Sequence, residues 1–423
     1  MCCKSRIFVY LIMQNGHWNL LHKIGFRFSF IFILFLILVM NNGAFPLFNL
    51  ISKPLDYLMH LFVPWFAKNV LHYSYDYSIY INGSGDTSYA WLVLLILFLI
   101  ALLGTIAWSI VDRERKNYDK CYYWLTTFIR YYIAFMLINY GVIKLVHGQM
   151  PPPSLDRLMQ TVGELSPMGL AWTYFGYSKG YNIFVGIMEI LSVLLLFRRT
   201  VILGALITMA VSINIMTVNY FFDVPVKMIS TVLFALSLFL LLPHIKPLYN
   251  LFLRGKSVRI KKIRRPKFNK SWKNIMLIVI KIAVISVFAT QQIFGLLNRQ
   301  KLINRYLKKS PLYGIYQIEN SRDLRTTIPE DWKSIVFEYD GHATIRDMFY
   351  KKKSVSPLID ARAHIIKLNN FTFDYSVLEN GDILLRKVLS DRTEEVKLIK
   401  QKPEEFELMK RKFNWIQEYP YNR

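Results

Sequence analysis

The residues best suited to chemistry are ionisable side chains that fall inside or beside apolar stretches of the sequence. Arg130 and Lys144 begin and end one such stretch, Glu189 lies within the next, and Asp223 and Lys227 open a later one. A carboxylate at the middle of a membrane span costs about 2–3 kcal/mol or more when it has no partner. Glu189 is therefore expected to face the helix bundle, where it pairs with Lys144, Lys227 or Arg130, or stays neutral.

Helical periodicity places Arg130, Ala134, Leu137, Gly141 and Lys144 on one face of a helix. Ala134 and Gly141 are small, so this face can approach another helix closely. The two cations lie roughly 21 Å apart along the axis, at 1.5 Å per residue, near opposite ends of the hydrocarbon layer. The alternative is that both side chains extend to the headgroups, although the acidic residues on later spans favour pairing for Lys144.

Two interpretations of these charges remain open. If Lys144, Glu189, Asp223 and Lys227 converge, they line an outward-opening polar cavity able to bind an anionic or quinone-like head group, so a quinone is the candidate cofactor. Otherwise the same charges form a structural network that holds helices together. The supporting residues expected nearby are Asn139, Tyr140 and Asn214. The sequence assigns no catalytic residue and predicts no metal site, because it lacks the ligand and nucleophile motifs of known sites.

The composition indicates an integral membrane protein, since 53% of the 423 residues are apolar and the mean hydropathy is +0.27. The net charge of +25 does not indicate nucleic-acid binding, because much of it flanks apolar spans. The basic run 254–273 is expected to attract anionic lipid, which makes the bilayer the expected partner. Three cysteines, Cys2, Cys3 and Cys121, make no disulfide framework.

Seven apolar segments predict an all-α transmembrane bundle, followed by a small C-terminal antiparallel β domain. The expected spans are 28–48, 91–110, 124–146, 182–197, 201–220, 223–242 and 275–297. The expected organisation is a basic segment 1–27, two spans with an interfacial loop in 28–119, a four-helix core in 120–242, a basic linker 243–274, a seventh span 275–297 and a β-rich domain 298–423. The start at Met1 or Met13 stays open, and no small-residue cleavage site follows the first apolar run.

The loop after the first span contains a predicted amphipathic helix, 55–72, that lies at the membrane interface. In the C-terminal region, 334–339 alternates like a strand, and 371–388 predicts a hairpin with a type I′ turn at Asn380-Gly381. A small barrel or sandwich is expected. The aromatic C-terminal segment 415–423 is expected to dock on this domain.

Basic residues predict the orientation of the chain. The proposed inner segments carry 21 Lys and Arg, whereas the proposed outer loops carry 4. By the positive-inside rule the N-terminus is cytoplasmic, and seven crossings put the C-terminal domain outside. In a diderm bacterium this means an inner-membrane protein with a periplasmic domain.

The segment from Arg130 to Leu242 resembles the DoxX-like family of bacterial multi-pass membrane proteins. That family has an arginine opening one span, a lysine near the far end of that span and a glutamate in the next, here Arg130, Lys144 and Glu189. The larger members also carry the motifs seen here in 166–169, 223–227 and 422–423.

The resemblance implies a four-helix core and, for some members, redox work as subunits of membrane complexes. The chain is therefore expected to be a membrane subunit or scaffold that binds a small molecule or quinone, with membrane or periplasmic protein partners. Two other readings stay open: a transporter or lipid-handling protein, and a membrane enzyme with Glu189 or Lys144 as general base. The absence of paired cysteines argues against thiol chemistry.

Overall fold

The computed structural model describes residues 18–76, 84–258, 268–306, 308–319, 332–388, 393–410 and 414–420. Met1, Met13, Cys2, Cys3, residues 259–267 of the basic linker and the final Asn422-Arg423 lie outside these described residues. The chain forms two compact units. The membrane unit comprises 1–151 and 166–295, and the sheet unit comprises 152–165 and 296–423.

Seven helices of the described chain are long and apolar enough to cross a membrane, which confirms the predicted fold class. They are α1 (Leu20–Val39), α3 (Ser88–Val111), α4 (Asp119–Leu145), α7 (Lys179–Ile190) continued by η2 (Leu191–Leu196), α8 (Val201–Phe221), α9 (Lys227–Leu241) and α11 (Ser271–Tyr306). The remaining helices are α2 (Asn49–Asn69), α5 (Leu155–Leu158), η1 (Val162–Glu164), α6 (Pro167–Tyr177), η3 (Leu242–His244), α10 (Ile245–Phe252), η4 (Pro403–Glu405) and α12 (Glu407–Lys410).

The first span differs from the expected segment 28–48, because α1 covers Leu20–Val39. The Asn19 side chain caps its N-terminus by accepting from the His22 N–H at 2.8 Å. Arg27 lies inside this helix and is buried. A charge therefore does not end the span here, since the arginine finds hydrogen-bond partners within the unit.

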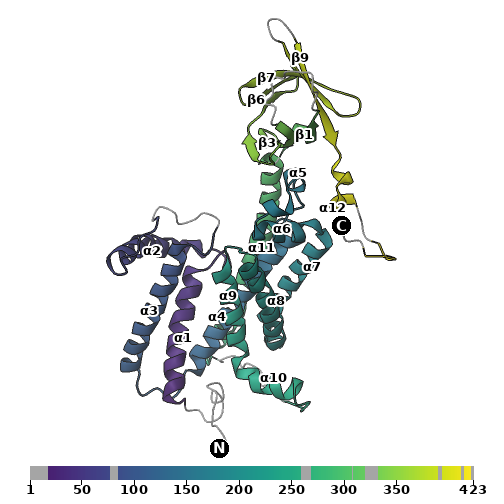
Figure 1. The fold of residues 1–423 in the computed structure, drawn as a ribbon. Coiled ribbons are helices and arrows are strands. Elements are labelled where there is room, and N and C mark those ends of the chain that lie inside the picture. Colours follow the sequence, from purple (N-terminus) through teal and green to yellow (C-terminus); the bar gives the residue numbers. More distant parts are fainter. Residues whose placement is uncertain are drawn as a thin grey trace, which may run out of the picture. The chain divides into compact units, whose positions relative to one another are not determined.

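Two helices of the membrane unit run across the direction of the spans, α2 at one end and α10 at the other (Figure 1). α2 begins earlier than the predicted helix 55–72. Its buried residues Met59, Val63 and Ala67 are spaced by four, while Leu58 and Trp65 on other faces are more than half exposed. This one-sided burial is typical of a helix that lies at a membrane surface.

α4 forms the centre of the membrane unit. Its residues 132–137 are all buried, and α1, α7, η2 and α9 pack around it. The ring of Phe135 stacks on Phe288 of α11 with centroids 4.1 Å apart. α4 is thus the helix on which α1, α7, α9 and α11 pack.

The sheet unit contains one curled antiparallel sheet of nine strands in the order β4-β3-β2-β1-β9-β8-β7-β6-β5. The strands are β1 (Lys309–Ile318), β2 (Trp332–Tyr339), β3 (His342–Asp347), β4 (Lys352–Val355), β5 (Leu358–Asp360), β6 (Ile365–Leu368), β7 (Phe371–Val377), β8 (Ile383–Val388) and β9 (Thr393–Gln401). Its core is built from alternating residues such as Ile335, Phe337 and Leu398.

The predicted hairpin is present, since β7 pairs with β8. The turn type was wrong. A type I′ turn needs positive φ at both central residues, and of this pair Gly381 has φ +85° whereas Asn380 is not in that region. Gly381 N–H donates to Leu378 O at 2.9 Å, and Leu378 N–H donates to Asp382 O at 2.8 Å, which makes a longer loop around Gly381.

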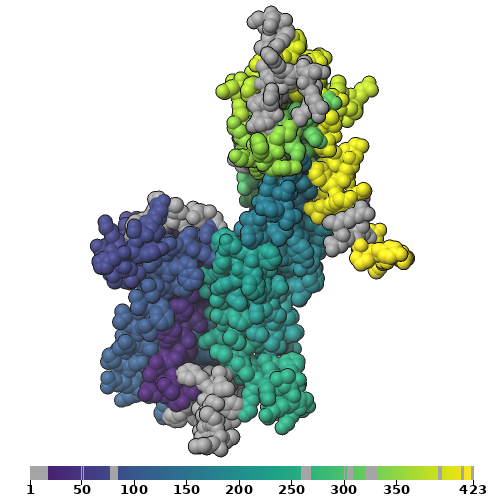
Figure 2. Space-filling view, in the orientation of Figure 1, coloured from purple at the N-terminus to yellow at the C-terminus, as the bar shows by residue number. Residues whose placement is uncertain are grey.

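The aromatic C-terminal segment does not dock on the sheet as expected. Trp415, Ile416 and Tyr419 are 91%, 79% and 83% exposed. The described segment 414–420 that contains them, at the yellow end of the colour bar, extends away from the rest of the sheet unit in Figure 2. Residues 152–165, which we call the strap, pack on the sheet instead. Leu155 of the strap packs on Ile315 and Val336.

Candidate functional site

The candidate site lies where α4 crosses α7. Both helices carry a glycine at the crossing, Gly141 and Gly186. A Cβ atom on Gly141 would lie 2.7 Å from the Gly186 carbonyl oxygen, and one on Gly186 would lie 2.8 Å from the Gly141 oxygen. The backbones therefore touch at this point, as small residues in membrane helices allow. The close approach of a small face on α4, expected from Ala134 and Gly141, is confirmed.

One turn beyond each glycine, the crossing brings Lys144 and Glu189 together. Lys144 Nζ donates to both carboxylate oxygens of Glu189 at 2.8 Å. The two side chains are 6% and 0% exposed. The Tyr140 ring lies on one side of the ammonium, with its centroid 5.8 Å away. This is a bidentate ion pair enclosed by membrane helices.

Arg130 has a different partner. It is buried, and its Nε donates to the Leu195 carbonyl at 2.7 Å. Lys281 Nζ from α11 donates to the next carbonyl, Leu196 O, at 2.9 Å, and Thr200 Oγ1 donates to Leu194 O at 2.6 Å. Three successive carbonyls at the end of η2 are thus satisfied, two of them by cations, which the negative end of a helix dipole favours.

Asp223 and Lys227 form a second, separate pair at the start of α9. Lys227 Nζ lies 2.8 Å from Asp223 Oδ1, and the aspartate side chain is 80% exposed. The Asp86 carboxylate accepts the backbone N–H groups of Lys227 and Met228 at 2.7 and 2.9 Å, so it caps this helix. The structure therefore divides the four predicted residues into one enclosed pair and one exposed pair.

The supporting residues also separate. Tyr140 is half-buried and lies beside Lys144. Asn139 is half-buried, and its Nδ2 faces the turn at Gly43. Asn214 is exposed on α8. Among the three, Tyr140 is the residue in contact with the enclosed pair.

Sequence reasoning missed a buried cluster around Arg27 on α1. Its guanidinium donates to Tyr118 Oη and Ser109 Oγ, both at 2.8 Å, and to Asp112 O at 2.7 Å. Trp108 Nε1 donates to the Asp112 carboxylate at 3.2 Å. These partners lie more than 80 residues away in the chain. The sequence offered one indication of this cluster, an arginine at the edge of an apolar run. The same pattern is equally typical of an arginine that extends to the lipid headgroups.

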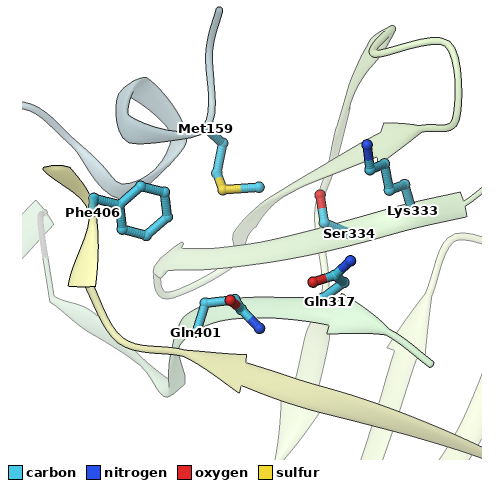
Figure 3. Close-up of a pocket in the computed structure, with 6 residues that line it drawn as sticks. All are labelled: Met159, Gln317, Lys333, Ser334, Gln401 and Phe406. Carbon is cyan, nitrogen blue, oxygen red and sulfur yellow. The ribbon is translucent and has the colours of Figure 1, made fainter. Parts of the chain in front are cut away.

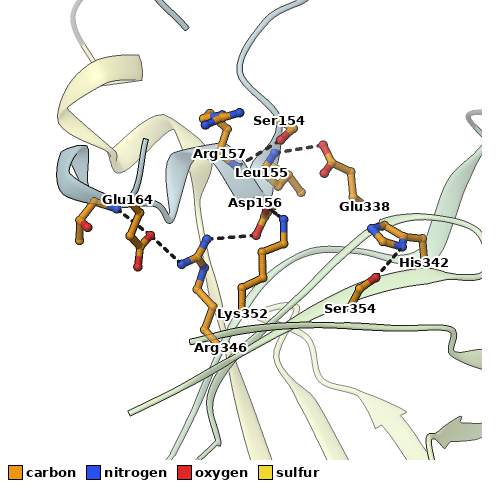
Figure 4. Close-up of polar contacts among 11 residues, drawn as sticks. Ser154, Leu155, Asp156, Arg157, Glu164, Glu338, His342, Arg346, Lys352 and Ser354 are labelled. Carbon is orange, nitrogen blue, oxygen red and sulfur yellow. Dashed lines mark hydrogen bonds and ion pairs between the residues drawn. The ribbon is translucent and has the colours of Figure 1, made fainter. Parts of the chain in front are cut away.

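It also missed a cluster in the sheet unit, where the strap meets the sheet (Figure 4). Arg346 of β3 is 2% exposed. Its Nη2 lies 3.3 Å from Asp156 Oδ1 and its Nη1 lies 3.1 Å from Glu164 Oε2. Lys352 forms an ion pair with the other oxygen of Asp156. Two acids of the strap are thus held by two cations of the sheet.

Glu338 of β2 holds the strap at a further point. Its carboxylate accepts from the Leu155 N–H at 3.1 Å. Burial raises the pKa of Glu338 above its ordinary value, and the nearby Asp156 carboxylate adds to the rise, although the strap N–H groups oppose it. The strap contact therefore includes an acid that is easier to protonate than a solvated glutamate.

These features define the class: a polytopic helical membrane protein whose chain also folds a curled antiparallel sheet. Comparison with known proteins found 40% identity over 122 residues with "Uncharacterized protein YwoB" of Bacillus subtilis (strain 168). The match covers 26% of this chain and 71% of the relative. The chain therefore belongs to the same family as YwoB. No family model matches the chain, and no solved structure matches it.

Proposed function

We propose that this chain is a membrane scaffold subunit whose Lys144–Glu189 site binds the polar head group of a small molecule, with a quinone as the leading candidate. The observation that carries the proposal is the enclosure of this ion pair between membrane helices. Replacing a buried pair by well-packed apolar residues is often neutral or stabilises a protein by about 1–4 kcal/mol. A charged pair at this depth is thus a candidate for work beyond holding the fold together.

Lys144 supplies the donor that such a head group needs. An ammonium has three donor hydrogens, and the two bonds to Glu189 use two of them. Lys144 retains 5% of its surface and Glu189 retains 1%, so a ligand reaches the lysine first. A quinone carbonyl oxygen, or an anionic oxygen, is an acceptor that suits this third hydrogen.

Membership of the DoxX-like family is part of the proposal. It is supported by the positions of Arg130 at the start of a span, Lys144 near the far end of that span and Glu189 in the next. The scaffold role is supported by the folded sheet that follows the last span, because such a module offers protein partners a surface. The proposed involvement of this chain in redox chemistry rests on its resemblance to the DoxX-like family.

The retention of native small molecules tests the site. The chain is purified in nanodiscs from its host membrane, extracted with solvent and analysed by mass spectrometry. The wild type is expected to retain a quinone or another small molecule with a polar head group. The double variant Lys144→Met/Glu189→Leu is expected to lose it while remaining folded, and Asp223→Asn, which alters the exposed pair, is expected to retain it. Equal retention by all three proteins would overturn the proposed site.

We also propose that the protein lies in a bacterial inner membrane with its N-terminus in the cytoplasm and the sheet unit in the periplasm. The support is the excess of Lys and Arg in the proposed inner segments. In a chain with Cys2, Cys3 and Cys121 changed to serine, Glu379→Cys is expected to react with an impermeant maleimide in intact cells. Glu114→Cys is expected to react after lysis. The reverse pattern would invert the orientation.

A further inference from the structure

The strap packs on one face of strands β1 and β2. A hollow remains beside it, where Gln401 of β9 also lines the wall. Register places Gln317 beside Ser334 and Ile315 beside both Val336 and Gln401. Paired residues, and residues two apart along a strand, share a face of the sheet. This face is therefore apolar beneath Leu155 of the strap, and polar beyond it.

The hollow is a half-open pocket of about 200 Å³ (Figure 3). Phe406 and the strap residue Met159 supply its apolar walls. Ser334 and Lys333 rise from β2 toward Met159, where the register between Trp332 and Ser334 is irregular. The six lining residues are Met159, Gln317, Lys333, Ser334, Gln401 and Phe406.

The Ser334 hydroxyl is the feature that indicates a ligand. The residue is 2% exposed, and its Oγ makes no hydrogen bond with any described residue. A buried hydroxyl without a partner lowers the stability of the fold. The hydroxyl lines the pocket, so a ligand there would satisfy it.

The charges around the pocket select an anionic ligand. Lys333 is held in place by a hydrogen bond from its Nζ to Tyr350 Oη at 3.0 Å and by the Tyr350 ring, whose centroid lies 4.1 Å away. That bond uses one of its three donor hydrogens. Gln317 and Gln401 add carboxamide donors, and the six lining residues include no acid.

We propose that this pocket binds a small carboxylate with an apolar body. The carboxylate accepts from Ser334 and Lys333, and the apolar body packs between Met159 and Phe406. Size supports this class, because a cavity of about 150 Å³ holds a benzene ring, and the pocket has room for a ring and one carboxylate. The site lies wholly in the sheet unit and does not depend on the proposed membrane site.

Benzoate binding to the full chain in phosphatidylcholine nanodiscs tests the proposal, measured by saturation-transfer difference NMR with empty nanodiscs as the blank. The wild type is expected to bind benzoate and to bind the neutral analogue benzamide at least fivefold more weakly. Ser334→Val and Lys333→Met are expected to weaken benzoate binding by about tenfold, the loss of one charge-assisted hydrogen bond. The exposed control variants Ser354→Val and Lys353→Met on β4 are expected to bind like the wild type.

A second variant, which fills the pocket with a larger side chain, tests the proposal even if Ser334→Val does not fold. Gln317 is exposed on β1, where a tryptophan suits a strand, so Gln317→Trp is expected to fold and to exclude benzoate. The proposal is overturned if the wild type gives no more signal than empty nanodiscs, or if it binds benzamide as well as benzoate. It is also overturned if Gln317→Trp binds benzoate like the wild type. Retention of small molecules by the Lys144–Glu189 site is read separately, so either result can fail alone.

Discussion

The enclosed ion pair makes a strong prediction about stability. At 2.8 Å and an effective dielectric constant of about 20, the gross attraction between Lys144 and Glu189 is about 6 kcal/mol. Desolvation of both groups offsets much of it. Breaking such a pair by removing one partner costs about 3–5 kcal/mol, because the other charge stays buried and unpaired. We therefore expect Lys144→Met and Glu189→Leu each to lower the free energy of unfolding by about that amount.

The double variant Lys144→Met/Glu189→Leu is expected to behave differently. It buries no charge at the crossing of α4 and α7, so its free energy of unfolding should lie within about 1 kcal/mol of the wild type or above it. Independent effects would instead add to about 6–10 kcal/mol. The assay is reversible unfolding by SDS in mixed micelles, followed by far-UV circular dichroism.

Asp223→Asn is the matched control, because its carboxylate is 80% exposed and pairs with Lys227 at the same 2.8 Å. An exposed pair contributes about 1 kcal/mol or less. The reasoning is refuted if the single variants at Lys144 and Glu189 unfold like Asp223→Asn. It is also refuted if the double variant loses as much free energy of unfolding as the two single variants lose together.

Further predictions concern the helix crossing and the strap. Gly141→Ala puts a Cβ 2.7 Å from the Gly186 carbonyl oxygen, so it should lower the free energy of unfolding by more than 1 kcal/mol in the SDS assay. Gly295→Ala is the control, because its Cβ meets open space, and it should be neutral or stabilise α11. Arg346→Met should raise hydrogen exchange of the strap amides at least tenfold, because two acids lose their buried partner; Arg386→Met, from an exposed pair, should not. Burial raises the pKa of Glu338, so the folded state binds the proton more tightly than the unfolded one. The contribution of Glu338 to the protection of the strap amides against hydrogen exchange should therefore be full below pH about 4.5. It should fall as the pH rises through the raised pKa. Exchange rates of the strap amides are measured against pH in the wild type and in Glu338→Gln, and the difference between them should show this pH dependence. A difference that stays constant with pH would contradict the prediction.

Hydropathy and local chemistry determined the membrane part of the fold. Seven spans were predicted, and all but the first lie close to their observed bounds, because an apolar segment of about 20 residues has few alternatives to a membrane helix. Glu189 was expected to find a cation because an unpaired carboxylate in the bilayer is costly. Gly141 was expected at a close helix contact for a similarly local reason. The hairpin 371–388 was also visible, since alternation and a glycine turn are encoded in neighbouring residues.

Tertiary structure alone decided which of several possible partners each charge meets. Lys144, Lys227 and Arg130 were all candidates for Glu189, and the choice of Lys144 depends on the α4–α7 crossing, which no local pattern specifies. The strap shows the same limit. Arg346 meets Glu164 and Asp156 across 182 and 190 residues of sequence, and the sequence there reads as a surface loop and an ordinary strand. Local patterns fix the period and the length of an element because both arise from neighbouring residues, whereas ion pairs and the pocket beneath the strap depend on distances between elements that exist only after the chain has folded.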